Sequence, residues 1–185
     1  MTVATDPRIF RYRIDALGAI VWVNPEWLDF ARENGAEHLA NPPVVGQPLE
    51  LHIAGESTRH VYELILKKVR GEERPIKFRY RCDSPDKRRF MEMTVTPLRD
   101  DDVEFASRIL KIEDRDPVAF LDPDRPAEGD FVKVCSWCRK VQVGDGWLEV
   151  EDAVRVLRLM ERHILPPISH GICEGCLRSI QFDAF

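Results

Sequence analysis

Four cysteines near the end of the chain have the residue type and the spacing of a metal site. Cys135 and Cys138 form one C-x-x-C pair, and Cys173 and Cys176 form a second. Each pair supplies two thiolates from one tight turn, and two such turns can face each other around a tetrahedral ion. Because four sulfur ligands leave no open position, the pattern predicts a structural site, for which zinc is the best fit. A rubredoxin-like iron site and a redox-active pair are the alternatives.

The other interpretations of these cysteines depend on the compartment. The first ten residues, MTVATDPRIF, lack the basic start and the apolar run of a secretory signal peptide, so we expect a cytoplasmic protein with reduced thiols rather than a disulfide framework. A c-type haem attachment needs His directly after the second cysteine of a pair, where this chain has Arg139 and Leu177. Cys82, the fifth cysteine, falls in the apolar register of an expected strand and is predicted to be a core residue.

His170 lies three residues before Cys173 and could replace one thiolate. Since four cysteines already complete a tetrahedron, we place His170 around the metal rather than on it, with ligation as the alternative. Four thiolates and a dication leave a net charge of about −2, which nearby cations must offset. The candidates flank the cysteine pairs: Lys133, Arg139, Lys140 and Arg178.

Composition places the chain among ordinary soluble proteins. It has 185 residues, of which 44% are hydrophobic and 32% are charged, and no stretch is apolar enough to predict a membrane span. The formal net charge of −5 disfavours the broad basic surface that non-specific nucleic-acid binding requires.

Hydrophobic periodicity predicts an α+β fold in the first two thirds of the chain. Two strands within residues 9–23 are joined by a turn at Asp15 to Gly18, and a short helix follows from Pro25 to Gly35 with Asn24 as its N-cap. Loops with one or two helical turns are expected over 36–56, a longer helix from Ser57 or Thr58 to Gly71, and three strands near 76–82, 88–96 and 103–112. This order predicts an antiparallel sheet with helices on one face.

Residues 8–113 resemble a PAS domain. The resemblance depends on Asp15-x-x-Gly18-x-Ile20, on Val23-Asn24-x-x-Trp27, on Val45-Gly46 and on the long helix that leads into three strands. It implies a PAS-like sensory domain whose helices and concave sheet face enclose a small pocket. The occupant of that pocket biases the state of a partner.

Residues 114–130 are rich in proline and acidic side chains and are predicted to be a linker. We expect it to allow some relative mobility of its two neighbours, moderated by three apolar residues, Val118, Phe120 and Leu121, that could pin it against one of them. Residues 131–185 then form a small metal-binding module, with a strand near 140–143 and a helix from about Glu149 to His163. Its C-S-x-C and S-H-G-I-C-x-x-C segments resemble a zinc-ribbon-like tail of bacterial proteins that also contain PAS or receiver domains.

Further cofactor and partner sites are weighed against simpler explanations. We expect no flavin, because the N-C-R motif of flavin-binding relatives is absent, and no haem, because His60 is a single histidine at the start of a helix. A group of arginines in the 76–96 region could bind an anion or an acidic partner, or could simply form the solvated face of two strands. This group comprises Arg79, Arg81, Arg88 and Arg89.

Together these features predict a non-enzymatic sensory or regulatory module of bacterial signal transduction that acts through protein–protein contact. The alternative is a zinc-dependent transcription regulator or nucleic-acid-binding protein, which the acidic composition disfavours. An enzyme would require one C-x-x-C to work as a redox pair. We also expect a homodimer through the residues before Asp15 and the outer sheet face, with Phe10 and Tyr12 as apolar candidates that could equally point into the core.

Overall fold

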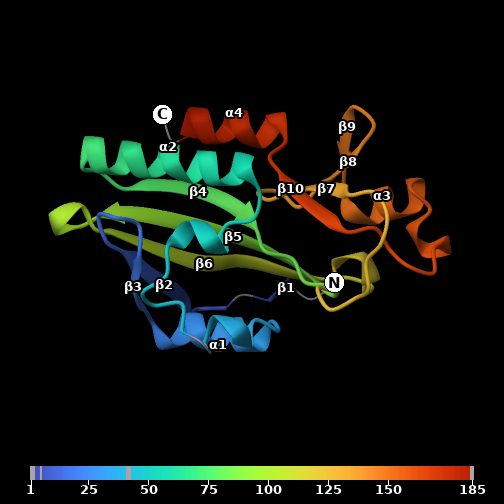
Figure 1. Cartoon of the computed structure of the whole chain (residues 1–185), viewed down its shortest axis with the longest axis horizontal. Coiled ribbons are helices and arrows are strands. Elements are labelled where there is room, and N and C mark those ends of the chain that lie inside the picture. The colour runs from blue at the N-terminus through green and yellow to red at the C-terminus, as the bar shows by residue number, and fades with distance from the viewer. Residues whose placement is uncertain (1–2, 5, 41–42, 184–185) are drawn as a thin grey trace.

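The computed structural model describes residues 3–4, 6–40 and 43–183. Within these ranges the protein is a mixed α+β fold with two sheets and four α-helices (Figure 1), so the predicted α+β class is confirmed. The larger sheet is antiparallel and has the strand order β3-β2-β6-β5-β4, with β1 also paired to β6. Its strands are β1 (Val3–Ala4), β2 (Ile9–Ile14), β3 (Ile20–Val23), β4 (Ile76–Arg81), β5 (Lys87–Pro97) and β6 (Val103–Asp114).

Alternation along the strands gives this sheet one buried face. Phe105 lies at its centre, opposite Tyr12 on one neighbouring strand and Val95 on the other. Three helices contribute to this side: α1 (Pro25–Glu33), α2 (Glu56–Glu72) and α4 (Glu174–Asp183). Phe30 of α1 packs on Phe10, Tyr62 of α2 on Phe105, and Ile180 of α4 joins the same buried cluster as Phe105. Figure 1 shows α2 and α4 above the sheet.

The N-terminal elements form as local rules predict. The hairpin and the short helix are confirmed, and the Asn24 side chain accepts a hydrogen bond from the backbone N–H of Trp27, as an N-cap residue does. The long helix begins at Glu56, slightly earlier than expected, and continues through Gly71 to a left-handed residue, Glu73. Pro42, one of the prolines of the 36–56 segment, lies outside the described residues.

The second sheet has the order β10-β7-β8-β9 and belongs to the C-terminal region. Its strands are β7 (Val132–Cys135), β8 (Val141–Val143), β9 (Gly146–Leu148) and β10 (Ile168–Gly171), and β10 runs parallel to β7. The helix α3 (Val150–Val156) packs on this sheet. None of the helices in the described part of the chain is long and apolar enough to cross a membrane.

The prediction of one helix over Glu149 to His163 is wrong in its second half. Helix α3 ends at Val156, Arg158 adopts a left-handed conformation, and Leu159–Glu161 form a separate 3-10 turn. This break directs Leu159 into the small core and leaves Met160 87% exposed. The helical spacing of apolar residues continues past the break and would bury Met160, but tertiary packing places Leu159 in the core instead.

Residues 114–130 contribute to packing as well as connecting. Phe120 and Leu121, in a 3-10 turn, are buried in the C-terminal core with Val134 and Val150. The C-terminal region also contacts the larger sheet directly, because Trp137 lies in the buried cluster that contains Phe105.

Candidate metal centre and ligand cavity

The four predicted cysteines come together at one point. Their Sγ atoms all lie within 4.8 Å of one another, and Cys138 Sγ is 3.8 Å from Cys173 Sγ. Zn–S bonds of about 2.3 Å in a tetrahedron place sulfur atoms about 3.8 Å apart. All five cysteines of the chain are free thiols. The cluster could therefore hold a metal ion.

Backbone pairing positions the two cysteine turns. Parallel pairing of β7 with β10 places Cys135 opposite Gly171, so the first turn faces the segment that leads to the second. The first turn is closed by two hydrogen bonds: Arg139 N donates to Cys135 O (2.9 Å), and Cys135 N donates to Lys140 O (2.8 Å). Cys173 N also donates to Cys135 Sγ at 3.4 Å, which favours a negative sulfur.

Electrostatics in the cluster favour a bound cation. Hydrogen bonds from the Cys138 and Cys176 thiols lower the pKa of Cys135 far below its ordinary value. In return, the hydrogen bond to Cys135 raises the pKa of Cys138 to about 12, and it raises the pKa of Cys176 as well. Without a cation, one thiolate thus suppresses ionisation of its neighbours. A divalent ion removes this penalty and allows all four sulfurs to bind as thiolates.

His170 is not part of the cluster of possible ligand atoms among the described residues. It is partly buried in β10, and burial together with the positive charge of Arg139 lowers its pKa. The Nε of Arg139 is buried and has no hydrogen-bond partner among the described residues. Of the other expected cations, Lys140 lies 4.0 Å from Glu149, and Arg178 lies 3.9 Å from Glu174.

The first cysteine turn is attached to the larger sheet. Trp137, between the two cysteines, packs its indole 4.7 Å from the ring of Phe78 and 6.1 Å from that of Tyr62. The backbone N–H of Arg81 donates to Trp137 O (2.8 Å), and Thr58 Oγ1 donates to Ser136 Oγ (2.8 Å). The turn that carries Cys135 and Cys138 thus contacts both the edge strand β4 and the helix α2.

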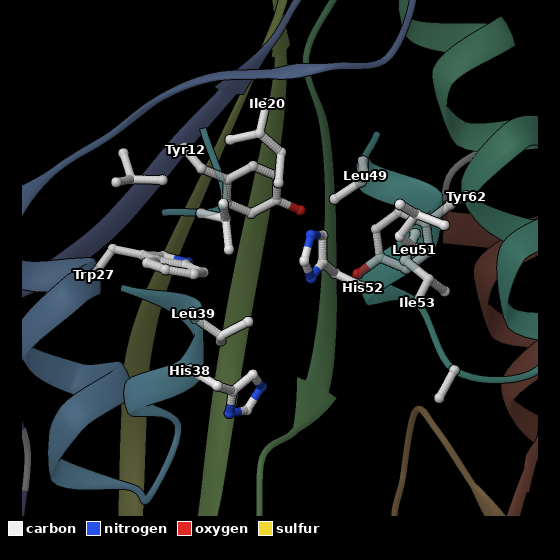
Figure 2. A pocket seen from close by; sticks show the side chains of 13 residues that line it. Tyr12, Ile20, Trp27, His38, Leu39, Leu49, Leu51, His52, Ile53 and Tyr62 are labelled. Atoms are coloured by element: carbon white, nitrogen blue, oxygen red, sulfur yellow. The ribbon is translucent and has the colours of Figure 1, made fainter. Parts of the chain in front are cut away.

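A cavity of about 460 Å³ lies between the sheet, α1, α2 and the segment before α2. Most of its lining is apolar, and Tyr12, Tyr62 and His52 point into it (Figure 2). The PAS resemblance implied a pocket in this region, but the sequence did not identify the side chains that line it. His60 is not among the described residues that line the cavity, and its imidazole is exposed and lies 3.5 Å from Glu63.

The structure does not gather the four predicted arginines into one basic surface. Arg81 pairs with Asp83 and Glu149, and Arg88 pairs with Glu151, so both bind carboxylates of this chain. The remaining two arginines differ from each other, because Arg89 is buried and its guanidinium lies over the Phe30 ring, whereas Arg79 is exposed.

The two apolar candidates for a dimer surface both lie on the inner face. Phe10 is 3% exposed and packs on Phe30, and Tyr12 lines the cavity. They point inward because they share the register of Ile14, whereas Ile9 and Arg13 take the opposite face. Ile9 and Trp22 are exposed instead.

The site therefore has two parts, a cluster of thiols that can hold a metal ion and a mainly apolar cavity, joined by the contact of Trp137 with Tyr62. Each part comes from elements far apart in the sequence. Neither the family models nor the curated proteins contain a match to this chain.

Proposed function

We propose that this chain is a non-enzymatic, PAS-like regulatory module of bacterial signal transduction, which binds a small molecule in the cavity and a structural zinc ion in the four-cysteine centre. The observation that carries the proposal is the contact between Trp137, which stands between two metal ligands, and Tyr62, which lines the cavity. A sheet covered by helices on one face, with a cavity of ligand size between them, supports the PAS-like assignment.

Zinc supplies folding free energy in this proposal. It connects the turn that follows β7, the residues after β10 and the first turn of α4, and so reinforces the parallel pairing of β7 with β10. A bound molecule then changes the packing of Tyr62 and Trp137. A protein partner in the cytoplasm binds the altered surface with a different affinity.

The proposed output includes a homodimer. Ile9 and Trp22 are exposed on the outer face of the larger sheet, and apolar side chains there favour self-association. Sedimentation velocity at micromolar concentration should show a dimer that Trp22→Glu converts to a monomer. A wild-type protein that sediments as a monomer would remove this part of the proposal.

Elemental analysis tests the metal assignment. We expect one zinc per chain in the purified protein, less than a tenth of that in Cys138→Ser, and unchanged zinc in the control Cys82→Ser, because Cys82 lies outside the thiol cluster. Stoichiometric iron would identify the rubredoxin-like alternative, and absence of both metals from the wild-type protein would contradict the proposal.

Titration with an uncharged aromatic probe, 2-naphthalenemethanol, tests the cavity. Ala54 lines the cavity and is exposed, so Ala54→Trp places an indole at the opening without changing the core. The probe should bind the wild-type protein and the control Leu17→Trp, whose position is 93% exposed in a turn, but not Ala54→Trp. Equal binding to all three proteins would place the probe elsewhere.

A further inference from the structure

Two phenol hydroxyls face the cavity. Tyr12 comes from β2 and Tyr62 from α2, and Figure 2 shows both hydroxyl groups pointing toward the part of the cavity that contains the His52 imidazole. Among the described residues neither hydroxyl has a hydrogen-bond partner, whereas the Tyr80 hydroxyl, outside the cavity, lies 2.8 Å from Ser107 Oγ. Both tyrosines are partly buried, and neither hydroxyl is among the fully buried unpaired atoms, so each is accessible to an acceptor from a ligand or from water.

The two phenols are held in place by packing. The Tyr12 ring stacks on Phe105 with centroids 4.6 Å apart, and the Tyr62 ring lies 6.1 Å from the same ring. Burial raises the pKa of Tyr12 well above its ordinary value and raises the pKa of Tyr62 to about 12. Both groups are therefore O–H donors at neutral pH, already oriented before a ligand arrives.

The rest of the lining indicates the charge and the polarity of the ligand. The described lining residues include no carboxylate side chain, and the ionisable ones besides the tyrosines are His38 and His52, both exposed near the opening. Aliphatic residues make up most of the remaining lining, and Ile20, Val44 and Leu49 among them are buried. The cavity thus presents hydrogen-bond donors at one place and an apolar wall elsewhere.

We propose that the cavity binds an apolar monocarboxylate, whose carboxylate group accepts hydrogen bonds from the Tyr12 and Tyr62 hydroxyls beside His52. This inference rests on the proposed function, because it requires the cavity to be a ligand site. A carboxylate has two acceptor oxygens and so serves both phenols at once, and hydrogen bonds to an ionised group are about twice as strong as neutral ones. The hydrocarbon part of the ligand contacts the aliphatic wall.

The position of His52 lowers the desolvation cost of binding an anion beside the two phenols. Full burial of an ionised carboxylate would be very costly, but His52 is exposed, so a carboxylate beside it keeps part of its hydration. An alcohol has a single oxygen to accept hydrogen bonds from the two phenols. An ammonium group only donates hydrogen bonds, so it cannot accept one from either phenol hydroxyl. The cavity therefore discriminates between ligands of the same size by their polar group.

Three naphthalene probes of similar size test this selectivity by isothermal titration of the full-length protein as purified. They are 2-naphthoate, 2-naphthalenemethanol and 2-naphthylmethylamine. We expect 2-naphthoate to bind at least tenfold more tightly than the alcohol and the amine to bind most weakly. Tyr12→Phe and Tyr62→Phe should each raise the Kd of 2-naphthoate about tenfold and that of the alcohol much less, since each removes one hydrogen bond to a charged group. Tyr80→Phe, the matched control, should leave all three Kd values unchanged.

The wild-type measurements alone separate the two proposals, so the test does not depend on the folding of a variant. If none of the three probes binds, the cavity is not a ligand site and the proposed function fails with the inference. If the probes bind with equal Kd values, or if the alcohol or the amine binds best, the cavity remains a ligand site and the monocarboxylate assignment is overturned. The same holds if folded Tyr12→Phe and Tyr62→Phe both bind 2-naphthoate as tightly as the wild-type protein.

Discussion

The indole ring of Trp137 meets the phenol ring of Tyr62 edge-on, with ring centroids 6.1 Å apart and an interplanar angle of 64°. Trp137 belongs to the turn that carries Cys135 and Cys138, and Tyr62 lines the cavity. A displacement of that turn can therefore reach the cavity wall through this contact. By thermodynamic linkage, a ligand that orders Tyr62 should also stabilise the metal centre.

Trp137→Ala removes the aromatic group that joins the cysteine turn to the sheet. Trp137 is 5% exposed, and a buried Trp→Ala change lowers the free energy of unfolding by about 3–5 kcal/mol through lost burial and the cavity left behind. Urea unfolding followed by circular dichroism measures this loss. Phe131→Ala removes an aromatic ring that is 70% exposed and should cost less than about 1 kcal/mol. Equal losses in the two variants would show that Trp137 is not a structural anchor.

A buried charge network connects β4 to the C-terminal region, with Asp83 at its centre. The Asp83 side chain is fully buried between the guanidinium groups of Arg81 and Arg115. Asp83→Ala leaves two buried cations without this partner, so we expect a loss of about 3–5 kcal/mol in the free energy of unfolding.

The exposed pair Asp114–Lys87 supplies the control for Asp83. Its Nζ–Oδ1 distance is 3.2 Å, but a solvent-exposed pair contributes less than about 1 kcal/mol. Asp114→Ala should therefore unfold at nearly the wild-type urea concentration. A small effect of Asp83→Ala as well would mean that the network adds little stability.

Glu151 should make the free energy of unfolding depend on pH in the acidic range. Burial alone would raise its pKa, but hydrogen bonds from Arg88 and Arg115 hold the pKa below its ordinary value of 4.5. A carboxyl with a lowered pKa stabilises the fold above the pKa of the unfolded chain, and this contribution is lost as the pH falls through the folded value. The difference in free energy of unfolding between the wild-type protein and Glu151→Gln should therefore be largest near pH 7 and shrink below pH 4.5. A difference at Glu151 that stays constant from pH 7 to pH 3 would refute the assignment.

Gly55 lies where α2 meets β10. It has a φ of +88°, and a Cβ atom there would lie 2.7 Å from the backbone oxygen of His170. Gly46 has a similar φ of +92° with no atom near the added Cβ. Both Gly→Ala variants incur about 1 kcal/mol of backbone strain, but Gly55→Ala should show a clearly lower melting temperature than Gly46→Ala because of the clash. Identical melting temperatures would show that β10 moves freely away from α2.

The sequence by itself determined the local features of this protein. The two C-x-x-C pairs identified the thiols that come within 4.8 Å of one another, because the spacing within each pair is set by a single turn. Alternation in residues 76–81 and the cap at Asn24 likewise predicted a strand and a helix start from neighbouring residues alone.

Only the tertiary structure decided which distant side chains meet. Tyr12 and Tyr62 are fifty positions apart, and nothing in their own segments distinguishes a cavity residue from a core residue. The same reason explains why Arg81 binds Glu149 instead of forming a free basic surface, and why the C-terminal helical pattern breaks at Arg158. Periodicity specifies the face of an element that is buried, whereas the partner on that face depends on how the elements pack together in three dimensions.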